Sequence, residues 1–135
     1  MQFFENVVFP RINDFILDKP MSHIRAGVAG EAIGRVLEIG AGTGLNFHHY
    51  APEAEVIAIE PSDGMRQRAL QRASGPDIRA RIRVEYGNAR QLPFDAGSFD
   101  TAVATFVFCS VENLAPAFAE IHRVLKKGGT LRLVD

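Results

Sequence analysis

Several features that mark particular classes of protein are scarce or missing in this sequence. Cys109 is the single cysteine among 135 residues, so no internal disulfide can form. No apolar run approaches the roughly 20 residues that a membrane-spanning helix needs, and the first residues lack the pattern of a secretory signal peptide. The 15 Lys and Arg nearly balance the 16 Asp and Glu, which gives no electrostatic sign of a nucleic-acid partner. We therefore expect a cytoplasmic protein with no transmembrane segment that binds no nucleic acid.

The hydrophobic pattern of the chain alternates between short apolar runs and amphipathic stretches. The runs predict strands and the stretches predict helices, with expected ranges of 35–39, 55–60, about 81–86, 99–106 and 130–135 for the strands and 22–32, 45–50, about 63–73 and 114–127 for the helices. Elements that alternate at this spacing are typical of the α/β class, as a Rossmann-like doubly wound parallel sheet. The fourth run is apolar throughout, so we expect this strand in the interior of the sheet.

The pattern also predicts how the chain is divided. Residues 1–34 are expected to form an N-terminal helical cap, in which Pro10 interrupts an amphipathic segment at 2–18, and residues 35–135 are expected to form the core. A complete sheet of this class continues beyond five strands, so we expect the core to be truncated after its fifth strand. The unpaired N–H and C=O groups of such an edge strand predict a homodimer or strand exchange.

A glycine-rich loop follows the first expected strand. Gly40, Gly42 and Gly44 occupy alternate positions, which permits a tight turn and brings backbone amides close to a ligand, beside the positive end of the following helix. The alternative is a plain strand-to-helix turn, for which one or two glycines would suffice. A dinucleotide fingerprint requires a glycine where Leu45 stands, so the loop favours a ligand other than NAD.

Polar residues also follow the second and third expected strands. At the end of the second, the Glu60 carboxylate can accept hydrogen bonds from both hydroxyls of a ribose, and it would repel the 2′-phosphate of NADP. After the third, the amide of Asn88 and the backbone N–H of Ala89 can read the edge of an adenine, with Met65 and Leu92 on its two faces. The alternatives are a solvated carboxylate for Glu60 and an ordinary turn residue for Asn88.

Five motifs of this sequence resemble those of the class I S-adenosylmethionine-dependent methyltransferases in order and spacing. They are Val36–Gly44, Ile59–Ser62, Gly87–Phe94, Ser98–Asp100 and Arg123–Gly129. The sequence is most similar to the type-11 branch, which includes the ubiquinone and menaquinone biosynthesis methyltransferases. Five motifs in register over residues 35–135 are far more specific than any one of them alone.

The resemblance implies S-adenosyl-L-methionine as the cofactor and a place for each part of it. It assigns the methionine portion to Glu38 and the glycine loop, the ribose hydroxyls to Glu60, and one side of the adenine to Pro61 and Met65. Asn88 stands where the family usually has Asp, so its carbonyl oxygen would contact the adenine amino group. The cofactor-binding residues implied in this way are Glu38, Gly40, Ala41, Gly42, Gly44, Glu60, Pro61, Met65, Asn88, Ala89, Thr105 and Phe106.

The residues at and after the end of the fourth expected strand face the reacting centre in this resemblance. Thr105 and Phe106 match positions that contact the methionine amine and flank the sulfonium. Cys109 and Ser110 follow on the side of the methyl acceptor, where we expect them to line the acceptor pocket. For Cys109 the alternative is a small buried residue without chemical function, because a lone cysteine usually packs in the core.

The function implied by the resemblance is methyl transfer to a small or lipid-like acceptor. None of the four histidines has a visible triad-like partner, so no catalytic base is assigned, and no metal site is predicted. One alternative is a cofactor-binding module that dimerises and does not catalyse. An NAD-dependent oxidoreductase is a further alternative, which Leu45 disfavours.

Overall fold

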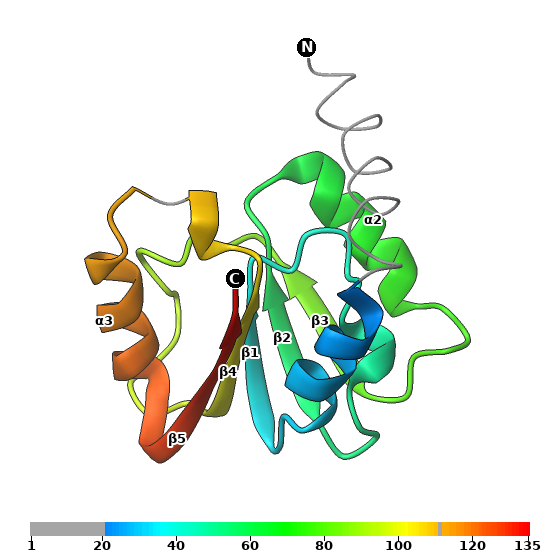
Figure 1. Ribbon diagram of the computed structural model, residues 1–135, viewed down its shortest axis with the longest axis horizontal. Coiled ribbons are helices and arrows are strands. Elements are labelled where there is room, and N and C mark those ends of the chain that lie inside the picture. The colour runs from blue at the N-terminus through cyan, green and yellow to red at the C-terminus, as the bar shows by residue number, and fades with distance from the viewer. Residues whose placement is uncertain (1–20, 111) are drawn as a thin grey trace.

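The computed structural model describes residues 21–110 and 112–135 of the chain (Figure 1). The amphipathic segment expected at 2–18 therefore lies outside the described residues. Residues 21–30 are helical, and the elements that follow are β1 (Arg35–Ile39), the 3-10 turn η2 (Phe47–His49), β2 (Glu55–Ile59), α2 (Asp63–Ala73), β3 (Arg81–Glu85), β4 (Phe99–Thr105), the 3-10 turn η3 (Phe108–Ser110), α3 (Ala115–Val124) and β5 (Leu125–Val134).

All five strands form one parallel sheet in the order β3-β2-β1-β4-β5. The chain builds outward from β1 to β3 on one side, then returns to the other side of β1 for β4 and β5. The strand order therefore reverses between β1 and β4. This arrangement is the predicted doubly wound parallel sheet, and β4 lies in its interior as predicted.

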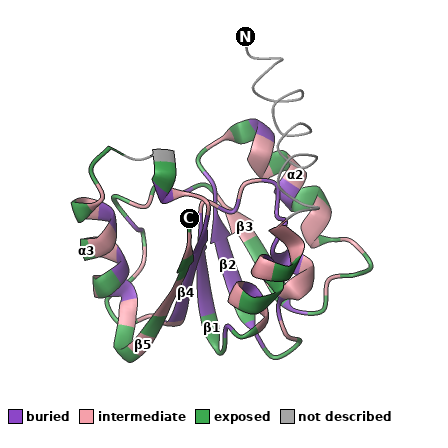
Figure 2. Cartoon of the chain, in the orientation of Figure 1, coloured by how far each residue is buried: buried purple, intermediate pink, exposed green. Residues whose placement is uncertain are grey.

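Both faces of the sheet are covered, because successive side chains of a strand point to opposite sides. One face packs against the helix at 21–30, against α2 and against η2, through the buried side chains of Ala29, Val36, Phe47, Tyr50, Ala58, Ala69 and Val103. The other face packs against α3, through Leu37, Ile57, Phe99, Ala102, Ile121 and Val124. Figure 2 shows β1, β2 and β4 largely buried, whereas β3 and β5 carry more exposed positions.

The helix predicted at 45–50 is not formed. Residues 42–46 are turns, and only Phe47–His49 makes a 3-10 turn. Phe47 and Tyr50 are fully buried, so the packing of these two aromatic side chains determines the path of the segment, which is too short for a stable helix of its own. Consequently the segment that follows the glycine loop, residues 42–50, forms no α-helix whose positive end could face the loop.

The last helix ends earlier than predicted, and the last strand begins earlier. Leu125 has extended backbone angles, packs against the core of the sheet and pairs with Phe99 of β4. A register shift follows before Thr130 pairs with Thr101, and Gly128 has a φ of 81°, which glycine adopts without steric cost. The contact of Leu125 with the core and its pairing with Phe99 therefore end the helix at Val124, although the hydrophobic pattern predicted helix as far as Lys127.

The helices of residues 21–110 and 112–135 are too short or too polar to cross a bilayer. In the same residues, no three side chains of the His, Cys, Asp or Glu type lie together in a way that could hold a metal ion.

Candidate functional site

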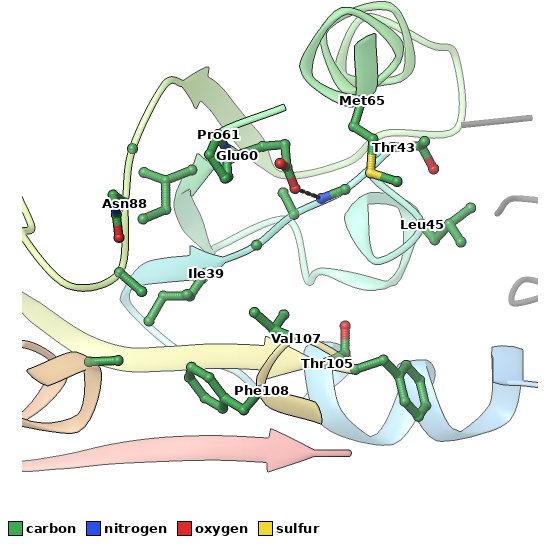
Figure 3. Close-up of a pocket in the computed structure, with 18 of the residues that line it drawn as sticks. Ile39, Thr43, Leu45, Glu60, Pro61, Met65, Asn88, Thr105, Val107 and Phe108 are labelled. Carbon is green, nitrogen blue, oxygen red and sulfur yellow. Dashed lines mark hydrogen bonds between the residues drawn. The ribbon is translucent and has the colours of Figure 1, made fainter. Parts of the chain in front are cut away.

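A cavity of about 440 Å³ lies at the carboxyl ends of the strands (Figure 3). Sites for small molecules have volumes of roughly 300–1,000 Å³. In open parallel sheets such ligands bind where the strand order reverses, which in this sheet is the point between β1 and β4. The cavity is lined by the glycine loop, by residues that follow β2, β3 and β4, and by one side chain from the helix at 21–30.

Most of the residues predicted to bind the cofactor meet at this cavity. The ones that line it are Gly40, Ala41, Gly42, Glu60, Pro61, Met65, Asn88, Ala89, Thr105 and Phe106. They come from four separate segments, which the sheet brings to one edge because parallel strands end on the same side. Glu38 and Gly44 were predicted at the site but do not line the cavity.

The three glycines of the loop differ in what surrounds them. All three have positive φ angles, of 63° at Gly40, 60° at Gly42 and 87° at Gly44. A Cβ at Gly40 would lie 2.7 Å from Val107, and one at Gly44 would lie 2.6 Å from Phe47. These two glycines are therefore required by the packing of the protein. A Cβ at Gly42 would have only the Met65 sulfur nearby, at 3.8 Å, so Gly42 leaves open space on the cavity side of the loop.

The carboxylate of Glu60 lies beside the glycine loop, where two backbone amides hold it. The N–H of Gly42 donates to one oxygen at 2.9 Å, and the N–H of Ser62 donates to the other at 2.7 Å. Burial raises the pKa of Glu60, while these two hydrogen bonds and the nearby Arg66 act in the opposite direction. Glu60 is 7% exposed, and it connects the end of β2 directly to the loop.

The position of Glu60 depends on the start of α2. The Ser62 hydroxyl accepts a hydrogen bond from the N–H of Met65 at 3.4 Å and caps this helix. Arg66 lies one turn into the helix and donates to the carbonyl oxygen of Glu60 at 3.0 Å. The first turn of α2 therefore fixes the backbone on which the carboxylate is carried, and it brings Met65 to the cavity.

Glu38 is buried behind the loop instead of facing the cavity. Its side chain is 1% exposed, and the hydroxyl of Tyr50 donates to it at 2.5 Å. Burial raises the pKa of Glu38 to about 7, although the hydrogen bonds from Tyr50 and Asn46 and the charge of Arg25 lower it. Burial likewise raises the pKa of Tyr50, and the neighbouring Glu38 adds to this effect. Direct contact between Glu38 and a ligand therefore remains a prediction.

Asn88 lines the cavity and also stabilises its own turn. Its side-chain oxygen accepts a hydrogen bond from the N–H of Arg90 at 2.9 Å, and its backbone carbonyl oxygen accepts one from the N–H of Gln91 at 3.0 Å. Asn88 therefore acts as a turn residue, the alternative considered from the sequence, and it also lines the cavity. Leu92 was expected to cover one face of an adenine, but it is buried in the core and does not line the cavity.

The segment after β4 contributes residues that the sequence did not single out. Phe106 has a φ of 56°, a conformation that costs a non-glycine residue energy and that is frequent at functional sites. Its N–H donates to the carbonyl oxygen of Val134 at 2.8 Å, which holds this turn against β5. Val107 and Phe108 also line the cavity. Val107 and Phe108 were not predicted at the site, because their apolar side chains resemble those of a core strand, whereas Phe106 of the same segment was predicted there.

Cys109 does not line this cavity, so its place in an acceptor pocket stays a prediction. Its side chain is exposed, and its sulfur lies 3.7 Å from the carbonyl oxygen of Phe106, so the alternative of a buried cysteine is wrong. The side chain of Ser110 lies outside the described part of the structure. Of the histidines, His122 is exposed on α3, away from the cavity.

Comparisons with known proteins identify the family to which this chain is similar. Residues 37–133 match the family described as a methyltransferase domain. The ubiquinone/menaquinone biosynthesis C-methyltransferase UbiE of Dinoroseobacter shibae is 34% identical over 111 residues, which cover 80% of this chain and 44% of the relative. Phosphatidylethanolamine N-methyltransferase of Cereibacter sphaeroides is 34% identical over 102 residues, which cover 76% of this chain and 50% of the relative. The chain thus spans about half the length of these relatives.

A solved structure shows the same arrangement of strands and helices. It belongs to a SAM-dependent methyltransferase of Thermotoga maritima, a possible histamine N-methyltransferase. The TM-score is 0.71 with 30% sequence identity, over 95% of this chain and 57% of that chain.

Proposed function

This chain belongs to the type-11 family of class I S-adenosylmethionine-dependent methyltransferases, and we propose that it transfers the methyl group of S-adenosylmethionine to a small or lipid-like acceptor. The observation that carries the proposal is the contact between Glu60 and Gly42. A carboxylate oxygen of Glu60, which follows β2, lies 2.9 Å from the Gly42 amide nitrogen of the glycine loop that follows β1, at a cavity of suitable size.

The residues at the cavity fit this cofactor. The open space beside Gly42 admits a ligand against the loop backbone, because a Cβ there would meet nothing closer than 3.8 Å. The two oxygens of Glu60 are placed to accept hydrogen bonds from both ribose hydroxyls. We assign Pro61 and Met65 to one face of the adenine and Asn88 to its edge.

The methionine end of the cofactor is assigned to the other side of the cavity, next to β4. Thr105 and Phe106 lie there, and both line the cavity. A neighbouring strand is about 4.8 Å away in a sheet, and β2 and β4 are separated by β1. The ends of β2 and β4 are thus about 10 Å apart, so a ligand held at Glu60 must extend across β1 and the glycine loop to reach Thr105.

The chemistry requires little from acid or base residues of the chain. When bound, the cofactor supplies a methyl group on a sulfonium whose departure leaves a neutral thioether. The residues of the cavity act by holding the two reactants in line and by excluding water, and good alignment can contribute about 7–11 kcal/mol to the lowering of a barrier. The apolar side chains of Val107 and Phe108 at the cavity suit the exclusion of water.

The class of acceptor is proposed from the relatives. One is named for ubiquinone and menaquinone biosynthesis and another for phosphatidylethanolamine, which are lipid-like molecules. We also propose that the protein acts in the cytoplasm, and that the outer edge of β5 pairs with a second copy. Sedimentation at increasing protein concentration tests the second copy, and a monomer at all concentrations would contradict it.

Calorimetric titration with S-adenosylhomocysteine tests the cofactor site. The unaltered chain should bind this product, and Glu60→Gln should weaken binding about tenfold or more, because an amide accepts hydrogen bonds less well than a carboxylate. Glu55→Gln is the matched control, since Glu55 is exposed at the opposite end of the same strand. Equal affinity in the Glu60 variant and the control would contradict the assignment.

Turnover tests the activity itself. Labelled methyl groups from S-adenosylmethionine should appear in a quinone, phospholipid or small-amine acceptor when a panel of these compounds is supplied. Tight binding of the cofactor without transfer to any compound would favour the module that binds without catalysis.

A further inference from the structure

The edge of the sheet formed by β3 is rich in arginine. Residues 63–90, which include α2 and β3, contain seven arginines and three acidic residues, a net charge of +4 in a chain whose net charge is −1. The rest of the chain therefore carries a net charge of −5. Because β3 lies at one edge of the sheet (Figure 1), the positive charge is concentrated on one side of the molecule.

The arginines of this edge point away from the core. Four alternate residues of the segment pack into the core cluster that includes Ala69 of α2, namely Ile78, Ala80, Ile82 and Val84. Successive side chains of an extended chain point to opposite sides, so Arg79, Arg81 and Arg83 point to the other side, and all three are exposed. A hollow of about 230 Å³ continues this surface from Arg81 and Arg83 to Arg35 of β1, with one acidic residue, Glu55, in its lining.

Much of this positive charge has no acidic neighbour. Arg83 forms an ion pair with Glu85 at 2.7 Å. In the part of the chain that the structure describes, Arg79, Arg81 and Arg90 form no ion pair. Arg90 is exposed, follows β3 and lines the cavity. The four arginines named here, which we call the arginine flank, thus extend from the start of β3 to the cavity.

We propose that the arginine flank binds the surface of a membrane that contains anionic phospholipids. Basic side chains are attracted to the headgroups of such a membrane, and the net negative charge of the rest of the chain disfavours contact through other faces. Tyr86 directly follows β3 and is 65% exposed, and tyrosine is a residue type enriched where a membrane meets water.

Contact along the arginine flank also has a consequence for the cavity. Arg90 belongs both to the flank and to the lining of the cavity, so a membrane bound at the flank lies beside the cavity. A lipid-like acceptor resides in that membrane and can reach the cavity without crossing water. This consequence rests on the proposed function, whereas the contact with the membrane rests on the charges alone.

Protection of the sheet edge is the simpler reason for charged residues on β3. Charged side chains on an edge strand prevent its pairing with other chains. Either sign of charge serves that purpose, whereas the exposed charged residues at 79, 81 and 83 are all arginine. Edge protection also predicts no affinity for anionic lipids, so a binding experiment separates the two explanations.

Cosedimentation with vesicles tests the proposal. The unaltered chain should bind vesicles of equal parts phosphatidylglycerol and phosphatidylcholine, should not bind vesicles of phosphatidylcholine alone, and should be released by salt. A variant that combines Arg79→Gln with Arg81→Gln should bind the anionic vesicles about twentyfold more weakly, because each basic residue near such a surface contributes about fivefold.

The matched control combines Lys126→Gln with Lys127→Gln. It removes the same charge from exposed residues of β5, at the opposite edge of the sheet. Four strand spacings place β5 about 19 Å from β3, which is beyond the Debye length of about 8 Å at physiological ionic strength. This control should therefore keep the affinity of the unaltered chain for the anionic vesicles.

Several results would overturn the proposal. Equal binding of the unaltered chain to both kinds of vesicle would do so without recourse to a variant, as would binding to a short RNA but to neither kind of vesicle. Equal affinity of the arginine variant and the lysine control would also contradict it. Calorimetry with S-adenosylhomocysteine, which the arginine variant should bind as the unaltered chain does, is the separate readout. Failure of the unaltered chain in that titration would contradict the proposed function and leave the contact with the membrane standing.

Discussion

Replacing Glu38 by glutamine should change how the stability of this protein depends on pH. The carboxyl is buried, and burial raises its pKa from 4.5 to about 7 in the folded protein. Tyr50, Arg25 and Glu60 are the charged or titratable groups that act on it. Glutamine has nearly the same shape, and its amide oxygen can accept the hydrogen bond that the Tyr50 hydroxyl donates to Glu38.

The sign and size of the effect follow from the two pKa values of Glu38. Because the folded protein holds the proton more tightly than the unfolded chain, the contribution of Glu38 to stability falls as the pH rises from about 4.5 to about 7. One pKa unit corresponds to about 1.4 kcal/mol, so the ionised carboxylate costs on the order of 3 kcal/mol above pH 7. The neutral amide that Glu38→Gln introduces carries no such cost at any pH.

Urea unfolding of both proteins between pH 4.5 and pH 8 measures this difference. The free energy of unfolding of Glu38→Gln, minus that of the unaltered chain, should rise by on the order of 3 kcal/mol over this range. Burial, the largest cause of the raised pKa of Glu60, is common to both proteins, so most of its contribution cancels. Glu53→Gln, which removes an exposed carboxyl, is the matched control. A difference that stays constant with pH would refute the reasoning.

Three further outcomes are expected. Gly42→Ala should abolish binding of S-adenosylhomocysteine while costing only about 1–2 kcal/mol of stability for its positive φ. Gly40→Ala should in addition lower Tm sharply, because its Cβ would lie 2.7 Å from the side chain of Val107. Similar Tm values for the two variants would contradict this reasoning. Arg123→Ala should weaken binding, because Arg123 and Glu120 hold the backbone of residues 92–94, which follow the cavity-lining residues 87–90. Calorimetry of this variant beside Lys126→Ala measures the effect. His122→Ala, on the exposed face of α3, should leave binding unchanged in the same titration.

Much of the fold followed from local patterns. The ranges of β1 and α2 agree with the prediction, and the remaining strands of the described residues were expected in their observed order. The reason is that an apolar run flanked by turn residues has few ways to be buried other than as an interior strand. Where the predictions were wrong, at residues 45–50 and at Leu125, a distant partner decides the local path. Phe47 and Tyr50 enter the core beneath the loop, and Leu125 pairs with Phe99.

The sequence by itself determined the family, the class of sheet and the segments that supply the site. The reason is that glycines at alternate positions and a carboxylate at the end of a strand are local patterns, which can be recognised without knowledge of distant contacts. Only the tertiary structure decided which side chains face the cavity. It turned Glu38 inward to Tyr50 and brought Arg25 to Thr105, eighty residues away. Such placements depend on how helices pack against the two faces of the sheet, and the spacing of residues along the chain carries no information about that packing.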